Sequence, residues 1–257
     1  MTNSAHKDSL EVRLAAGRPA FGAWMFFQEP GIAASASKLG FDFVVIDMQH
    51  GVVGFDATCR MIDAVRLGRA AAVVRLPGLD AGLAGRCLDA GAVGLIFPMI
   101  NSRAEAEAAV RACKYPPHGL RSMGAIGATL HYGDDYFDHG NGLSAVIPMI
   151  ETREAVANLD DILSVEGIDM VLVGPSDLAI SYGQTPMSDN PDPEVQATLA
   201  HVAARCAAHG MVAGIYASAG LAAKRLAQGY RLVSIGTDWD AAIGGLAGDL
   251  AVVRSGA

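Results

Sequence analysis

Eight short runs of apolar and β-branched residues recur along the chain, and they constrain its fold more than any other feature. Most of the runs are apolar at nearly every position instead of at alternate positions. Continuous hydrophobicity of this kind is typical of a strand covered on both faces, as in a parallel sheet. The runs are Ala20–Phe26, Phe43–Met48, Ala71–Leu76, Val93–Met99, Ala145–Ile150, Asp169–Val173, Val212–Tyr216 and Leu232–Ile235.

The segments between these runs have the spacing of amphipathic helices. Phe55, Cys59 and Ile62, for example, fall on one face of a helix. Strands that alternate with helices, with no linker or change of composition, predict a single (β/α)8 TIM barrel, an α/β fold, over residues 1–257 with a helical lead-in at 1–17. An open, doubly wound sheet is the alternative, but no glycine-rich dinucleotide fingerprint follows the first run.

Charge and cysteine content narrow the class of protein. A formal charge of -8 over 257 residues argues against a nucleic-acid partner bound through its phosphates. No apolar run approaches the ~20 residues that span a bilayer, and the first residues lack the apolar core of a signal peptide. The four cysteines are far apart and lack metal-ligand spacing, so we expect reduced thiols in a cytoplasmic protein.

Two longer segments interrupt the alternation of runs and helices. Tyr115–Gly142 separates the fourth run from the fifth, and Tyr182–Pro193 follows the sixth and is rich in turn-forming residues. Long loops on a compact barrel are usually active-site lids or interface elements, and we expect one of these roles here. Disordered surface insertions are the alternative.

Polar side chains recur where the apolar runs end, whereas the opposite ends begin mostly with Gly, Ala or surface residues. In a (β/α)8 barrel the C-terminal ends of all strands meet at one face, and this face carries the active site. The sequence therefore predicts an active site built from these side chains. In chain order they are Asp47, Gln49, His50, Arg75, Glu151, Asp177 and Asp238.

Two of these carboxylates are candidate metal ligands. Glu151 and Asp177 follow neighbouring strands, with no Cys or clustered His beside them. Carboxylate oxygens suit a hard cation such as Mg²⁺ or Mn²⁺. Taken singly, Glu151 is explained as an acid at a helix start and Asp177 as an N-cap. Taken together, with His50 and Arg75 on neighbouring strands, they favour a metal site.

His50 and Arg75 are candidate catalytic residues. A neutral imidazole suits a general base but needs a partner that fixes its tautomer, and Asp89 is the candidate partner. A structural histidine bonded to backbone is the alternative. The charge of Arg75 ends an apolar run, which predicts a clamp for a carboxylate or a developing enolate. The tight turn Val173–Asp177 can present backbone N–H groups to a ligand carboxylate.

Longer motifs resemble those of a known family. IDMQHG, Ile46–Gly51, resembles the signature IDGEHA of the class II pyruvate aldolases of the HpcH/HpaI family. The similarity continues through VVRLPG, KYPPHGLRSMG, IPMIETREA and EGIDMVLVGPSDL, and it extends from about Phe21 to Gly245. KYPPHGLRSMG, ETREA and GPSDL together are highly specific for this family.

The resemblance implies a barrel that cleaves 4-hydroxy-2-oxo acids reversibly into pyruvate, or hydroxypyruvate, and an aldehyde through a metal-stabilised enolate. It implies a divalent metal (Mg²⁺, Mn²⁺ or Co²⁺) and a homohexamer in which the last helix is exchanged between neighbouring barrels. The implied residues are the metal ligands Glu151 and Asp177, the base dyad His50 and Asp89, the enolate-stabilising Arg75, and backbone amides of Gly174, Pro175 and Ser176 for the keto-acid carboxylate.

Two positions depart from the family pattern. Gln49 stands where relatives usually carry Glu, which removes a negative charge beside the histidine. Met149 stands where relatives often carry Gln, which makes the keto-acid pocket less polar. A donor other than pyruvate, such as hydroxypyruvate, is therefore an alternative.

The sequence leaves two rival functions as alternatives. A metal-dependent barrel lyase acting on acyl-CoA hydroxy acids would need a basic patch for the CoA phosphates, and the sequence has no Lys/Arg cluster. A non-catalytic barrel subunit is the second alternative, and the intact set of candidate site residues argues against it.

Overall fold

The apolar runs form a closed, parallel barrel. The computed structural model describes Leu14 and residues 16–255. Each strand pairs with the next, and the last pairs with the first, which confirms the (β/α)8 barrel and rejects the open sheet. The strands are β1 (Ala20–Met25), β2 (Phe43–Asp47), β3 (Ala71–Arg75), β4 (Gly94–Phe97), β5 (Ala145–Ile150), β6 (Met170–Val173), β7 (Val212–Tyr216) and β8 (Leu232–Thr237).

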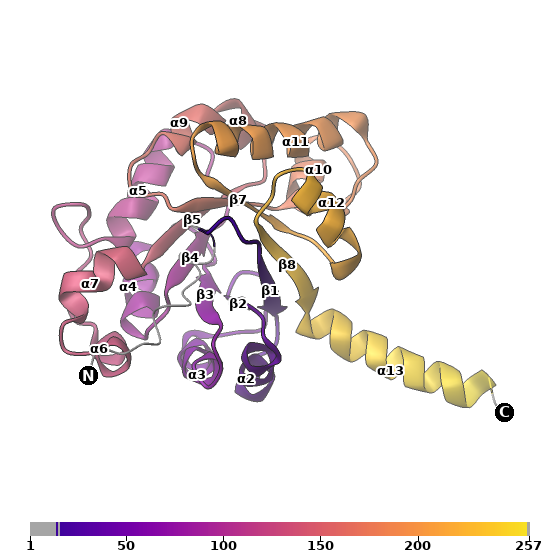
Figure 1. The fold of residues 1–257 in the computed structure, drawn as a ribbon, viewed down its shortest axis with the longest axis horizontal. Coiled ribbons are helices and arrows are strands. Elements are labelled where there is room, and N and C mark those ends of the chain that lie inside the picture. Colours follow the sequence, from indigo (N-terminus) through magenta and orange to yellow (C-terminus); the bar gives the residue numbers. More distant parts are fainter. Residues whose placement is uncertain (1–13, 15, 256–257) are drawn as a thin grey trace.

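Helices surround the barrel (Figure 1). No described helix is long and apolar enough to cross a membrane. The helices are α2 (Pro30–Leu39), α3 (Phe55–Val65), α4 (Ala81–Asp89), α5 (Arg103–Cys113), α6 (Ile126–Tyr132), α7 (Tyr136–Leu143), α8 (Arg153–Ala157), α9 (Leu159–Leu163), α10 (Pro175–Ser181), α11 (Pro193–Ala208), α12 (Ala222–Ala227) and α13 (Asp238–Ser255), with a 3₁₀ turn, η2, at Ala219–Leu221.

The strands lie close to the predicted runs and differ at their ends. β4 stops at Phe97 and not at Met99, because Met99 has a φ of 56°, which turns the chain out of the extended conformation. β8 continues to Thr237, two residues beyond the predicted end. The predicted lead-in at 1–17 lies almost wholly outside the described residues.

The second half of the long segment Tyr115–Gly142 is mostly helical, which contradicts the disordered alternative for this segment. It contains α6 and α7 and connects α5 to β5, which places it at the face where the strands begin. An active site at the opposite face cannot be covered by this segment of the same chain. It is therefore not a lid over its own barrel, and a role at an interface stays a prediction.

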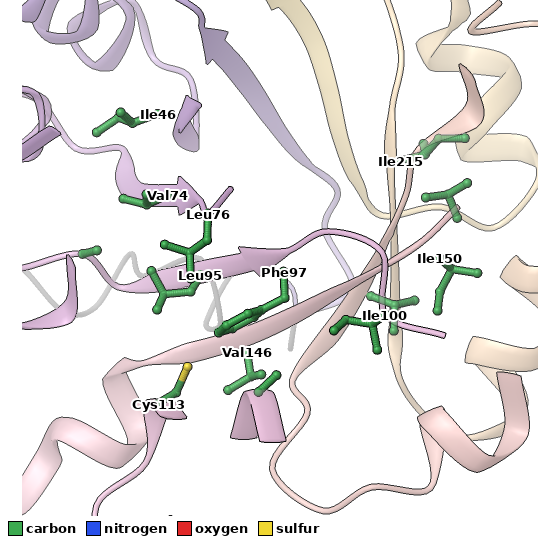
Figure 2. Close-up of a cluster of buried hydrophobic side chains, with 14 of the residues drawn as sticks. Ile46, Val74, Leu76, Leu95, Phe97, Ile100, Cys113, Val146, Ile150 and Ile215 are labelled. Atoms are coloured by element: carbon green, nitrogen blue, oxygen red, sulfur yellow. The ribbon is translucent and has the colours of Figure 1, made fainter. Parts of the chain in front are cut away.

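Two apolar layers explain why the strands are hydrophobic at consecutive positions. Alternate residues such as Trp24, Val45 and Leu172 fill the barrel interior. The residues between them, such as Ile46 and Val74, point outward and pack against the helices (Figure 2). Burial on both faces is what a parallel barrel strand requires.

The C-terminal helix α13 does not fold back onto the barrel. It extends away from it beyond β8 (Figure 1) and exposes large apolar side chains. Leu246 is 68% exposed and Val252 is 72% exposed. α13 therefore carries an apolar surface that the rest of its own chain leaves exposed.

The barrel interior leaves no room for a side chain at Gly22. A Cβ atom there would overlap the aromatic ring of Phe43, which is 2% exposed. We expect Gly22→Ala to destabilise the protein by about 1–3 kcal/mol, because overpacking forces the ring out of its site. The matched control is Gly142→Ala on α7, where a Cβ meets nothing within 4 Å.

For the control we expect no loss of stability, because alanine favours a helix over glycine by up to ~1 kcal/mol. Urea unfolding midpoints of both variants measure the difference. Equal midpoints would show that the interior near Phe43 can repack.

Candidate active site

A buried carboxylate at the end of β2 organises the mouth of the barrel. Asp47 is fully buried, and it pairs in register with Arg75 on β3. Arg75 donates to both of its oxygens, from Nε at 2.9 Å to Oδ1 and from Nη2 to Oδ2. Trp24 Nε1 on β1 donates to Oδ2 at 3.0 Å. One carboxylate thus ties three neighbouring strands together.

The pKa of Asp47 reflects these partners. Burial alone raises the pKa of a carboxyl group, but the hydrogen bonds and charge of Arg75, with the bonds from Trp24 and Gln49, outweigh it. The pKa of Asp47 therefore lies below its ordinary value. The environment therefore favours the charged form of Asp47, which binds Arg75.

Aromatic rings complete the wall around this ion pair. The guanidinium carbon of Arg75 lies 4.9 Å from the ring centroid of Trp24. Tyr216, the last residue of β7, packs edge-on against Trp24 with 5.2 Å between centroids. The aromatic rings limit the ways in which the Arg75 side chain can move.

His50 stands on a loop that wraps around the same carboxylate. The backbone N–H groups of Gln49 and His50 donate to Asp47 Oδ1 at 2.9 and 3.2 Å. The His50 side chain is exposed, and neither ring nitrogen bonds to another described residue. Its backbone is fixed while its imidazole stays accessible at the mouth, which suits a proton-transfer group better than the structural alternative.

Glu151 follows β5 and is buried with a single donor. Its Oε1 accepts from the backbone N–H of Met99 at 2.7 Å. Burial is the main cause that raises the pKa of Glu151 to about 7, and the negative charge of Asp177 adds to this rise. The Met99 bond and the charge of Arg75 oppose it. The charges of Asp177 and Arg75 therefore both influence Glu151 at the mouth.

Asp177 lies in the first turn of α10, close to the end of β6. The chain between them is packed against Glu151, because a Cβ at Gly174 would collide with Glu151 Oε2 and would lie 3.0 Å from Met149 Cε. Gly174 is the N-cap of α10 and Pro175 occupies its first turn. Pro175 has no N–H, so only Gly174 and Ser176 of the three predicted amides can donate.

Asp89 lies far from this site in its own chain. It ends α4, just before β4 begins, whereas His50 follows the end of β2 at the opposite face. Its Oδ1 accepts from Arg121 Nη2 at 2.8 Å, and the Arg121 side chain is fully buried. Within one protomer the structure does not bring His50 and Asp89 together.

The structure brings Asp47, Trp24 and Tyr216 together at the mouth. From the sequence, Asp47 is a strand-end polar residue without an assigned role, Trp24 an aromatic residue expected to shape a pocket, and Tyr216 the end of an apolar run. All three occupy interior-facing positions near strand ends, and this alternation could have indicated them.

Asp238 was also a strand-end residue without a role. Its carboxylate accepts from the backbone N–H groups of Phe26 and Phe27 at 2.8 and 2.9 Å.

The family model of the HpcH/HpaI aldolase/citrate lyase proteins matches residues 20–244. The chain belongs to this family. It is therefore a carbon–carbon lyase of the aldolase type, as its relatives are.

Three comparisons describe how close these relatives are. A hydroxypyruvate/pyruvate aldolase of Rhizorhabdus wittichii is 43% identical over 225 residues, covering 86% of this chain and 89% of the relative. A 5-keto-4-deoxy-D-glucarate aldolase of Escherichia coli O157:H7 is 32% identical and covers 93% of each chain. The crystal structure of a family member from Burkholderia cenocepacia matches with a TM-score of 0.89 at 30% identity, over 95% of this chain and 98% of that one.

The raised pKa of Glu151 has a consequence for metal-free protein. The folded state holds the proton up to about pH 7, whereas the unfolded state releases it near pH 4.5. Stability is therefore fully present below pH 4.5 and falls as pH rises toward about 7. At 1.36 kcal/mol per pKa unit, the loss is about 3 kcal/mol.

Glu151→Gln removes this ionisation, so in EDTA we expect it to be more stable than the wild type at pH 8 and similar at pH 4.5. Urea unfolding at both pH values measures the difference. The exposed neighbour Glu154→Gln is the control and should show no such gain. A Glu151→Gln variant without extra stability at pH 8 would contradict the assignment.

Proposed function

We propose that this protein cleaves 4-hydroxy-2-oxo acids reversibly into a short 2-keto acid and an aldehyde, with the aid of a divalent cation. One observation supports the proposal: Glu151 and Asp177 follow neighbouring strands at the C-terminal mouth of the barrel, close enough for the charges of Asp177 and Arg75 to shift the pKa of Glu151. A 2-keto acid offers two oxygens in a row, which suit a cation held by few protein ligands.

The residues present fit such a cation. Glu151 is buried, accepts one hydrogen bond and feels the negative charge of Asp177. Its pKa is raised because its own negative charge is unfavourable there, and a bound cation would offset that charge. No group of three or more His, Cys, Asp or Glu side chains able to hold a metal occurs among the described residues. Oxygen ligands from two residues favour Mg²⁺, Mn²⁺ or Co²⁺ over a closed zinc site. When bound, the metal would polarise the 2-keto oxygen.

Arg75 is preorganised for the negative charge that develops on the keto acid. Asp47 occupies its Nε and Nη2 groups, and Nη1 makes no hydrogen bond to another described residue. This nitrogen is available to an oxyanion at the mouth. Because Asp47 and Trp24 already fix the guanidinium, it needs no reorganisation as the charge appears.

His50 is proposed as the base that starts cleavage. It takes the proton from the 4-hydroxyl group, the C3–C4 bond breaks, the aldehyde forms, and the electron pair passes to the keto-acid fragment. The same group can return a proton to C3 of that fragment. The backbone amides of Gly174 and Ser176 are proposed to donate to the keto-acid carboxylate.

Asp89 can support His50 only if it comes from another protomer, because the two residues lie at opposite faces of one barrel. A homo-oligomer is therefore part of the proposal, and a hexamer is the form that the family resemblance implies. The exposed apolar side chains of α13 support docking of this helix on a neighbouring barrel. The four free cysteines suit a reducing compartment such as the cytoplasm.

The decisive experiment follows release of the keto acid from 4-hydroxy-2-oxo acids after treatment with chelator, before and after adding Mg²⁺, Mn²⁺ or Co²⁺. We expect activity to vanish on chelation and to return with metal, and Glu151→Gln to stay inactive. Glu154→Gln should behave as the wild type. Substrates that release hydroxypyruvate or pyruvate are compared, because a relative is named for both donors. Cleavage that survives full removal of metal would refute the mechanism.

His50→Ala tests the proposed base without disturbing the fold, because the side chain is exposed. We expect the turnover rate to fall by about 10²–10⁴-fold, the usual contribution of a general base, with Mn²⁺ affinity unchanged. His139→Ala on α7, another exposed histidine, is the control. Loss of Mn²⁺ binding would make His50 a ligand, and a near-normal rate would remove it from the mechanism.

A further inference from the structure

We infer that Asp238 is a positioning residue for the active-site loop that carries His50. The inference deepens the proposed function, on which the role of His50 rests. Asp238 itself lies at the junction of β8 and α13 and is 5% exposed. It acts through backbone groups and not through contact with substrate.

The first link joins Asp238 to the chain that leaves β1. Register pairing between β1 and β8 ends at Trp24 and Thr237. Phe26 and Phe27 then lack a strand partner, and the Asp238 carboxylate replaces it. Its Oδ1 accepts from Phe26 N at 2.8 Å and its Oδ2 from Phe27 N at 2.9 Å. Both oxygens of one buried side chain thus fix one peptide segment.

The second link joins this segment to the His50 loop. The carbonyl oxygen of Phe26 accepts from Val52 N at 2.8 Å. Gly51 is wedged between the two, because a Cβ there would collide with the carbonyl of Asp47 and would lie 2.9 Å from the Phe26 carbonyl oxygen. The residues directly after His50 are therefore held by Phe26.

Together the links hold the His50 backbone from two sides. Asp47 accepts from its N–H on one side at 3.2 Å, and Phe26 holds Gly51 and Val52 on the other. The His50 ring has no bond of its own to another described residue, so its position depends on this backbone. If Asp238 is removed, the Phe26 side of the support loosens while the Asp47 side stays.

The carboxylates proposed to hold the metal do not share the backbone support of His50. Glu151 is held by Met99, and Asp177 by the first turn of α10, and neither depends on the β1 segment. Loss of Asp238 should therefore slow the proton-transfer step and leave cation binding intact. A residue that served only global stability would not make this distinction.

Asp238→Ala and Asp238→Asn test the inference, with Asp240→Asn as the matched control. Asp240 is an exposed carboxylate two residues along the same helix, and its side chain bonds to no described residue. Asparagine keeps the size and one acceptor oxygen of Asp238, so it preserves the fold if alanine does not. We expect turnover to fall about 10- to 100-fold in Asp238→Ala and less in Asp238→Asn, because a displacement of about 1 Å can cost 10²-fold.

Two further readouts decide whether the loss arises from positioning. Mn²⁺ affinity should match that of the wild type, because Glu151 and Asp177 keep their own supports. Hydrogen exchange of residues 48–54 should become about 10-fold faster in the Asp238 variants, as expected on losing a bond to a charged group, and should be unchanged in Asp240→Asn.

The exchange measurement needs no substrate, so it separates the two hypotheses. If the wild type shows no metal-dependent cleavage, the proposed function fails, and faster exchange would still support the link from Asp238 to the loop. Unchanged exchange at residues 48–54 would overturn the inference, whatever the activity. Faster exchange with unchanged turnover in an active enzyme would overturn it as well.

Discussion

The mouth of the barrel depends on one buried anion. The carboxylate of Asp47 accepts hydrogen bonds from two side chains on the neighbouring strands and from two backbone N–H groups of the loop that follows it. A buried charge must be satisfied completely or it destabilises the fold. Here the groups that satisfy it include Arg75 and the backbone of His50. The requirement that stabilises the barrel therefore also places the residues proposed for chemistry.

Glu151 carries the same functional group as Asp47, but its surroundings shift its pKa in the opposite direction. It is as buried as Asp47 but has one donor and a carboxylate neighbour, and its pKa rises to about 7 where that of Asp47 falls. Two carboxyl groups at one mouth with shifts in opposite directions have different tasks. Asp47 is an anion fixed by protein donors, whereas Glu151 is the carboxylate that we propose holds an external cation.

The barrel and its strands could be predicted from the sequence, because residues on both faces of each strand are apolar and leave a local signal. The polar strand ends also indicated a site at one end of the barrel, and that site stays a prediction. The sequence did not reveal that Arg75 faces Asp47, since this pairing depends on the register of β2 against β3. The contact of Asp238 with Phe26 joins residues at opposite ends of the chain, and no local pattern records it. Asp89 illustrates a different limit. Sequence likeness implies a role for this position, but it does not say whether Asp89 of the same protomer or of a neighbouring one would fulfil that role.

The crowding at Gly174 bears on how this site can change during evolution or in the laboratory. A Cβ there would overlap Glu151 Oε2 and lie 3.0 Å from Met149 Cε. A side chain at position 174 would therefore displace the Glu151 carboxylate from its present place. Met149, whose flexible thioether ends against the same spot, is the neighbouring position that can exchange without a clash in the backbone. Of the two positions, residue 149 is therefore the one at which a substitution can reshape the mouth without displacing Glu151.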